Sequence, residues 1–202
     1  INQVSGILSQ IGTGFNSGKD YEKLENARLL DPSEYILNEK LGYISLNAAL
    51  NADEVLAVAY EYTVRGEIHT VGELTSNAPA APSTLVVKML RSTTQSPKMP
   101  TWDLMMKNVY NIGSYNLSAE DFVLDILYQN DKAGTMVNYL PAGDIDNKIL
   151  LSVMNLDRLN TQLDAIPDGR FDYIEGITVY SNKGRIVFPV LEPFGGWLEK
   201  KI

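Results

Sequence analysis

The sequence contains no cysteine and a single histidine, His69. The lack of cysteine excludes disulfides, thiolate nucleophiles and metal sites built from cysteine. One histidine alone argues against a catalytic triad or a multi-histidine metal centre. No run of about 18 apolar residues is present either, so the sequence predicts no transmembrane helix.

Basic residues are also scarce. The chain of 202 residues has 17 Lys and Arg against 25 Asp and Glu, a net charge of −8. This balance disfavours binding to duplex nucleic acid or to an anionic membrane surface, because both require cationic patches. It is compatible with cation binding. An apolar fraction of 45% with 21% charged residues predicts a globular protein rather than a disordered one.

The chain begins at Ile1 and shows no charged-then-apolar signal segment, so we expect it to be a piece of a longer protein. Glycine, serine and asparagine dominate residues 1–23, which predicts a lead-in strand or linker. Residues 24–196 are predicted to form a single β-rich soluble module, and residues 197–202 a tail.

Strand patterns dominate from residue 35 onward. Short apolar runs around turn residues predict hairpins at 36–46, 55–74 and 176–188. Further strands are expected at 85–90, 122–128 and 136–140. The predicted fold is mainly β, an antiparallel β-sandwich-like domain with one or two short helices.

One helix is predicted at residues 101–113. Its apolar residues recur at helical spacing, Thr101 can serve as its N-cap, and Gly113 can end it. Trp102 lies on the apolar stripe and is expected in the core. Residues 148–159 fit either a helix or a buried strand.

The most specific local pattern is an acidic loop. Asp164, Asp168, Asp172 and Glu175 stand at places 1, 5, 9 and 12 of a segment with glycine at place 6, which is the ligand spacing of an EF-hand-type calcium loop. Place 3 is Ile166, which offers no side-chain oxygen, and the following segment predicts a strand. The alternative is a polar Pro-Asp-Gly turn. Calcium is the one cofactor that the sequence suggests. Residues 143–147 form a second acidic loop, which has fewer potential calcium ligands.

No pattern indicates an enzyme. His69 lies in a predicted strand, and no G-x-S-x-G spacing accompanies it. The adjacent acid pairs at 53–54 and 120–121 stand at strand entrances, where solvated charge is expected. A hydrolase that works through two carboxylates would need a pocket that brings them together.

Several stretches together resemble one protein family. They are NARLL (26–30), PSEY (32–35), LGYISLN (41–47), LNADEVLAVAY (50–60), PTWDLMMKNVY (100–110), NLDRLN (155–160), PDG (167–169) and GRIVFPVLEPFG (184–195). Through these segments the chain resembles the SprA family of gliding-motility proteins on the surface of Bacteroidetes-type bacteria. The resemblance runs from about residue 24 to residue 195.

The resemblance implies a role in the cell envelope. Members of this family form the outer-membrane translocon of the type IX secretion system, a very large β-barrel with soluble inserted regions. This chain would then be one such region, without enzymatic activity and without catalytic residues. Its partners would be the rest of its parent barrel, other secretion components and exported cargo proteins, with no direct membrane insertion of the fragment itself.

A different class of function stays open. A cell-surface protein could use such a module for adhesion, by binding carbohydrate or another surface. That function would require exposed aromatic rings around Trp197 or Tyr173 on which a sugar could stack.

Overall fold

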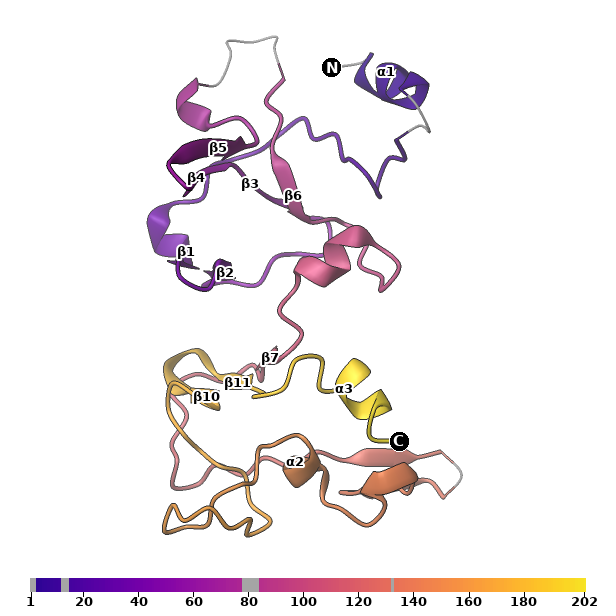
Figure 1. Ribbon diagram of the computed structural model, residues 1–202, viewed down its shortest axis with the longest axis vertical. Helices are drawn as coiled ribbons and strands as arrows, with labels where there is room; N and C mark the ends of the chain where they lie inside the picture. Colours follow the sequence, from indigo (N-terminus) through magenta and orange to yellow (C-terminus); the bar gives the residue numbers. More distant parts are fainter. Residues whose placement is uncertain (1–2, 12–14, 78–83, 132) are drawn as a thin grey trace. The chain divides into compact units, whose positions relative to one another are not determined.

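The computed structural model describes residues 3–11, 15–77, 84–131 and 133–202 (Figure 1). The chain divides into two compact units, Ile1–Met105 (unit 1) and Met106–Ile202 (unit 2). Both are built mainly from strands in small antiparallel sheets, with three short α-helices and several 3-10 turns among the described residues. The mainly β, antiparallel fold class is thereby confirmed. The boundary between the units falls inside the range 24–196, for which the sequence predicts one module.

Unit 1 begins with helix α1 (Val4–Gln10) and contains two hairpins. Strands β1 (Tyr35–Asn38) and β2 (Tyr43–Leu46) form the first, entered through the 3-10 turn η1 (Pro32–Glu34). Strands β4 (Tyr60–Val64) and β5 (Glu67–Val71) form the second, around Arg65 and Gly66. Both hairpins lie where the turn residues and apolar runs predict them.

The first strand of the hairpin predicted at 55–74 is divided in two. Strand β3 (Leu56–Val58) pairs with β6 (Lys88–Arg91), whereas β4 pairs with β5. Gly72 lies where these two pairs approach each other, with a φ of +72° and only 3.2 Å between an ideal Cβ and the Ala59 Cβ. The 3-10 turns η2 (Thr75–Asn77) and η3 (Pro100–Leu104) complete the unit. Most of the loop that follows η2 lies outside the described residues.

The predicted helix at 101–113 is wrong. Only η3 is helical, and Met105 already has an extended backbone, with a φ of −81° and a ψ of 138°. Residues Val109–Asn111 form strand β7, which pairs with β11 (Arg185–Val187). Cross-strand pairing with a distant segment overrides the helical spacing here, because Val and Tyr at 109–110 suit a strand and gain ladder hydrogen bonds.

Unit 2 is organised around a three-stranded sheet in the order β10-β11-β7, where β10 is Val179–Tyr180. The hairpin of β10 and β11 confirms the one predicted at 176–188, and its turn η5 (Ser181–Lys183) ends at Gly184. A second sheet pairs β8 (Tyr128–Asn130) with β9 (Thr135–Val137). Between the sheets in the sequence lie η4 (Gly143–Ile145) and α2 (Leu150–Val153), which makes part of the ambiguous stretch 148–159 helical, and α3 (Gly196–Glu199) follows β11.

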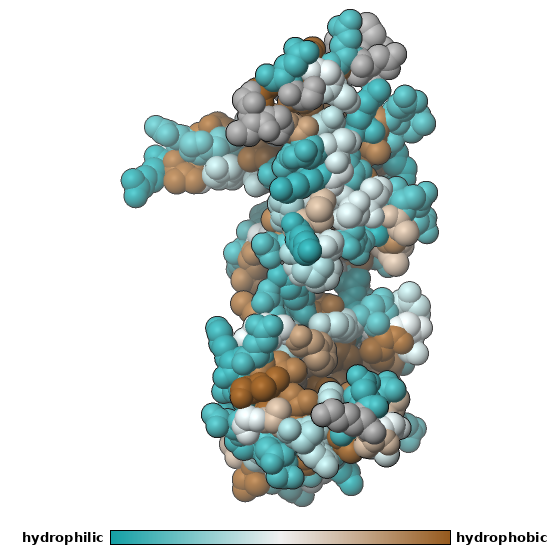
Figure 2. Space-filling model, turned by 90° about the vertical axis from the view of Figure 1, so that its right-hand side faces the viewer, coloured by the Kyte–Doolittle hydropathy of each residue, from teal (hydrophilic) through white to brown (hydrophobic). Residues whose placement is uncertain are grey.

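All the buried hydrophobic side chains among the described residues belong to unit 2. The core cluster comprises Leu151, Met154, Leu156, Val179, Ile186, Phe188 and Val190. Trp197 and Leu198, in the predicted tail, pack against this cluster. Exposed large apolar side chains far outnumber buried ones, and Figure 2 shows apolar residues scattered over the visible surface.

Gly184 is the tightest glycine of unit 2. Its φ is +58°, and a Cβ at this position would collide with the backbone carbonyl of Ser114. We expect Gly184→Ala to lower the free energy of unfolding by about 3 kcal/mol, from the left-handed backbone together with overpacking. Gly176→Ala is the control, because Gly176 has a φ of +78° and no atom within 4 Å of its Cβ position. It should cost only about 1 kcal/mol in urea denaturation, and equal losses would contradict the role of the contact.

An ion pair fixes the entrance to β1. Arg28 donates two hydrogen bonds of 2.7 Å to the Glu34 carboxylate, and the Asp31 N–H donates a third of 2.8 Å. The Arg28 guanidinium first, and then the Asp31 N–H, lower the pKa of Glu34 to about 2. Because this pKa is depressed, the stabilisation is complete above the ordinary value of 4.5 and is lost as the pH falls toward 2.

We expect Arg28→Gln to raise the pKa of Glu34 toward its ordinary value. Titration of the Glu34 carboxyl carbon by NMR measures this change directly. Lys40→Gln removes the same charge from an exposed residue and serves as the control. If the pKa of Glu34 shifts equally in both variants, the net charge of the chain and not the hydrogen bonds from Arg28 sets its value.

Candidate functional site

The four acids of the predicted calcium loop bond to separate partners. Asp164 accepts a hydrogen bond from the Asn160 side chain, Asp168 from the Arg170 N–H, and Glu175 from the Ser181 N–H. Among the described residues, no group of three or more acidic or histidine side chains is arranged to hold a metal ion. The structure therefore does not bring the four carboxylates together, and the calcium site stays a prediction. Gly169, with a φ of +83°, lies in a turn, as the alternative interpretation expects.

Two carboxylates instead fasten this segment to residues 155–160. Asp157, 2% exposed, accepts hydrogen bonds from the N–H groups of Asp168 and Gly169 at 3.0 and 3.2 Å. In the opposite direction, Asp172 accepts from the N–H groups of Arg158 and Leu159 at 2.7 and 3.2 Å. We call this reciprocal arrangement the carboxylate clasp.

The clasp is tied into the core of unit 2 at both ends. The Ser152 hydroxyl at the end of α2 donates a hydrogen bond of 2.5 Å to Asp157. The buried Thr178 hydroxyl donates to the carbonyl of Asp172 and accepts from the Ile174 N–H. A buried carboxylate with this many donors is satisfied, so its role is to hold backbone segments in place. The sequence pattern did not identify Asp157 as a structurally important residue. Its immediate sequence shows only an acid with a leucine close by on each side, which does not indicate that it is buried.

The second acidic loop, residues 143–147, is also held by backbone contacts. Ile145 at its centre is buried, and the Asp144 N–H donates a hydrogen bond of 3.2 Å to the carbonyl of Lys201. The loop therefore packs against the end of the chain.

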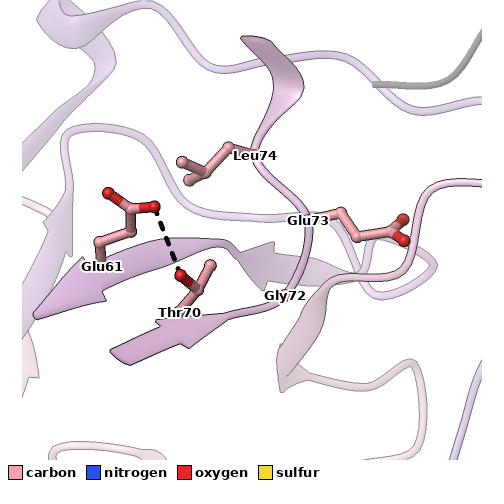
Figure 3. A pocket seen from close by; sticks show the side chains of 5 residues that line it. All are labelled: Glu61, Thr70, Gly72, Glu73 and Leu74. Atoms are coloured by element: carbon pink, nitrogen blue, oxygen red, sulfur yellow. Dashed lines mark hydrogen bonds between the residues drawn. The ribbon is translucent and has the colours of Figure 1, made fainter. Parts of the chain in front are cut away.

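A shallow polar pocket of about 330 Å³ lies at the end of the β4–β5 hairpin. Its lining includes two carboxylates, and Figure 3 shows them directed away from each other. Glu61 accepts a hydrogen bond from the Thr70 hydroxyl, whereas Glu73 accepts one of 2.7 Å from the Val86 N–H. This geometry does not offer the convergent pair of acids that glycoside hydrolysis requires.

His69 lies exposed on β5, and its ring stacks on Tyr62 of β4 with the centroids 5.1 Å apart. This agrees with its assignment as a strand-surface residue. The two rings face each other across the antiparallel strands, and such aromatic cross-strand contacts stabilise a hairpin.

The rings considered for sugar stacking are engaged with the core. Trp197 donates a hydrogen bond of 3.1 Å from Nε1 to the Val153 carbonyl, and the Tyr173 hydroxyl donates one of 3.1 Å to the Leu117 carbonyl. Both rings are half-buried against the core cluster. They do not form the exposed platform that a carbohydrate-binding module would need.

The second cavity is an apolar groove of about 280 Å³ in unit 2, which we call the unit 2 groove. It is lined by Tyr110 of β7 and Ile112 just after this strand, by residues 124–127, and by Ile186, Phe188 and Phe194. The rings of Tyr110, Phe188 and Phe194 pack edge to face, with centroids 5.3–5.6 Å apart. Desolvation in this ring cluster raises the pKa of Tyr110. Phe194 stays 51% exposed, so the groove presents an aromatic edge to its surroundings.

No family model matches the sequence, and no curated protein is similar to it. No described helix is long and apolar enough to cross a membrane.

The clasp gives a direct test of its structural role. We expect Asp157→Asn to lower the free energy of unfolding by about 2 kcal/mol, because one acceptor oxygen becomes a donor that faces backbone N–H groups. The exposed Asp146→Asn is the matched control and should change stability by less than about 0.5 kcal/mol. Urea denaturation measures both, and an Asp157 variant as stable as the control would remove the clasp as a stabilising element.

Proposed function

We propose that this chain is a non-enzymatic structural module of the outer-membrane translocon of the type IX secretion system, needed for protein export and gliding. The resemblance to the SprA family is the basis of this proposal. The resembling segments 155–160, 167–169 and 184–195 supply one of the two clasp carboxylates, Asp157, together with strand β11 and several residues of the core of unit 2. In unit 2 the resembling segments help to build the core and its sheet, which supports a shared architecture rather than a shared active site.

The observation that carries the proposal furthest is the distribution of apolar surface. Unit 1 has no buried hydrophobic side chain among its described residues, yet Leu29, Leu41 and Ile68 are each more than 70% exposed. Leu191 in unit 2 is 77% exposed. Large apolar side chains that a unit leaves uncovered are candidates for contact with other protein. They suit a module that is embedded in a larger assembly better than a free-standing enzyme.

Substitution of an exposed apolar residue in the parent protein tests this proposal. We expect Leu191→Lys to leave the unfolding free energy of the isolated chain within about 0.5 kcal/mol, because the side chain already faces outward. In the parent protein the same change should reduce export of cargo and gliding, since a charge would enter a covered surface. Export is measured as cargo in the culture medium, and gliding as spreading of colonies.

Gln162→Lys, at another exposed position of unit 2, is the matched control and should leave export intact. Deletion of residues 1–202 from the parent gene provides the second arm. Normal export and gliding after this deletion would refute the proposed role. Normal export in the Leu191 variant alone would show that this side chain is not covered in the assembly.

A further inference from the structure

Residues 122–127 form an extended segment whose backbone has no hydrogen-bond partner among the described residues. The exposure of its side chains alternates with the period of two that marks a strand. Phe122, Leu124 and Ile126 pack against the core cluster, whereas Val123 is 81% and Leu127 is 53% exposed. The predicted strand at 122–128 is thus regular only from Tyr128 onward, where β8 begins.

The segment lacks a partner because the opposite strand turns away. Strand β9 pairs with β8 only as far as Val137. Continuation of this register would place Asn138 and Tyr139 opposite residues 127 and 126. Instead, the Asn138 carbonyl accepts a hydrogen bond from the Leu150 N–H, and Tyr139 pairs with Ile149.

A second strand edge contributes to the same groove. Strand β7 lies at the margin of its sheet, with β11 on one side only. The Phe188 N–H donates to the Asn108 carbonyl, and the Ile112 N–H donates to the Gly184 carbonyl. These bonds show that the backbone groups of the even-numbered residues 108–112 point toward β11. The backbone groups of Val109 and Asn111 therefore point to the open edge. Tyr110 of this strand and Ile112 just after it line the unit 2 groove together with the consecutive residues 124–127.

We propose that the unit 2 groove accepts an extended strand from a partner protein, which pairs with residues 122–127 by β-augmentation. An extended backbone is the occupant that supplies N–H and C=O groups at the spacing of an open strand edge. The apolar lining receives every second side chain of that strand. Four consecutive residues of the segment line the groove. Since consecutive side chains of an extended segment point to opposite faces, the groove runs along the backbone edge of the segment and not along one face alone.

The charges of the segment specify the partner further. Asp121 and Asp125 alternate with Val123 and Leu127 on the exposed side of the segment. A strand in which Lys or Arg alternates with apolar residues complements this face. The same segment of a second copy offers no basic side chain to Asp121 and Asp125, and every register that places Asp125 opposite Asp121 or opposite itself brings acid against acid, which disfavours pairing between two copies. The occupant is therefore a basic, alternating strand of a different protein.

The test uses the full chain and a synthetic peptide of about ten residues in which valine and lysine alternate, a typical strand length. In the free chain, the amides of residues 123–127 should exchange rapidly with solvent in NMR hydrogen-exchange experiments. Saturating peptide should slow several of them. A peptide that alternates valine with glutamate should protect none, and one that alternates glycine with lysine should bind more weakly because glycine disfavours strands.

Charge reversal in the segment tests specificity. Asp125→Lys should weaken binding of the valine–lysine peptide by about fivefold or more, since an attraction becomes a repulsion. Asp146→Lys makes the same change at an exposed position away from the groove and should bind like the unaltered chain. Circular dichroism confirms that both variants keep their fold.

Four results would overturn the proposal. Amides 123–127 that are already protected in the free dilute chain would show that the edge is not open. Millimolar valine–lysine peptide without protection of these amides, or equal weakening in both variants, would exclude a specific strand site. Protection that grows with the concentration of the chain alone would identify a second copy as the occupant. The result of the peptide experiment does not depend on the result of the export assay above, so the strand site and the proposed function can each fail separately.

Discussion

The carboxylate clasp is the interaction on which the ordered part of unit 2 depends. Asp157 and Asp172 each accept hydrogen bonds from the backbone of the other's segment, and the segment between them carries no regular secondary structure. Backbone groups of an irregular segment need partners as much as those of a sheet do. By supplying these partners, the two acids allow Leu156 and Phe171 to pack against the core cluster. All four acids of the pattern that predicts a calcium loop accept hydrogen bonds from the protein itself, and one of them, Asp172, belongs to the clasp.

The two units use their apolar residues differently. In unit 2, side chains from α2, from the segment that carries Asp157 and from strands β10 and β11 together bury a small core. In unit 1 each sheet has two strands, and such sheets leave both faces open unless another layer packs on them. The exposed side chains of β4 and β5 follow directly from this arrangement. Surface that the chain itself does not cover is the common basis of the proposed structural role and of the proposed strand site.

Local signals predicted the hairpins, and non-local contacts explain what could not be predicted. The turn at Arg65–Gly66 and the one that ends at Gly184 are encoded by glycines with positive φ next to β-branched runs, so sequence suffices. The spacing of Trp102, Met105 and Val109 fits a helix equally well, and only the distant strand β11 decides against it. Alternation marks residues 122–127 as a strand but cannot reveal that β9 leaves them. The burial of Asp157 depends on a segment 11 residues away, so its sequence context resembles that of any solvated acid.

The pairing of β7 with β11 joins the two ends of unit 2. Lys107 contacts Glu192 across 85 positions, and the Asn108 side chain donates to the Phe188 carbonyl across 80. The chain entropy lost on closing so long a loop is repaid only when both ends are present. During synthesis from the N-terminus, β7 can therefore pair only after β11 has left the ribosome, so the sheet of unit 2 is completed late although β7 is made first.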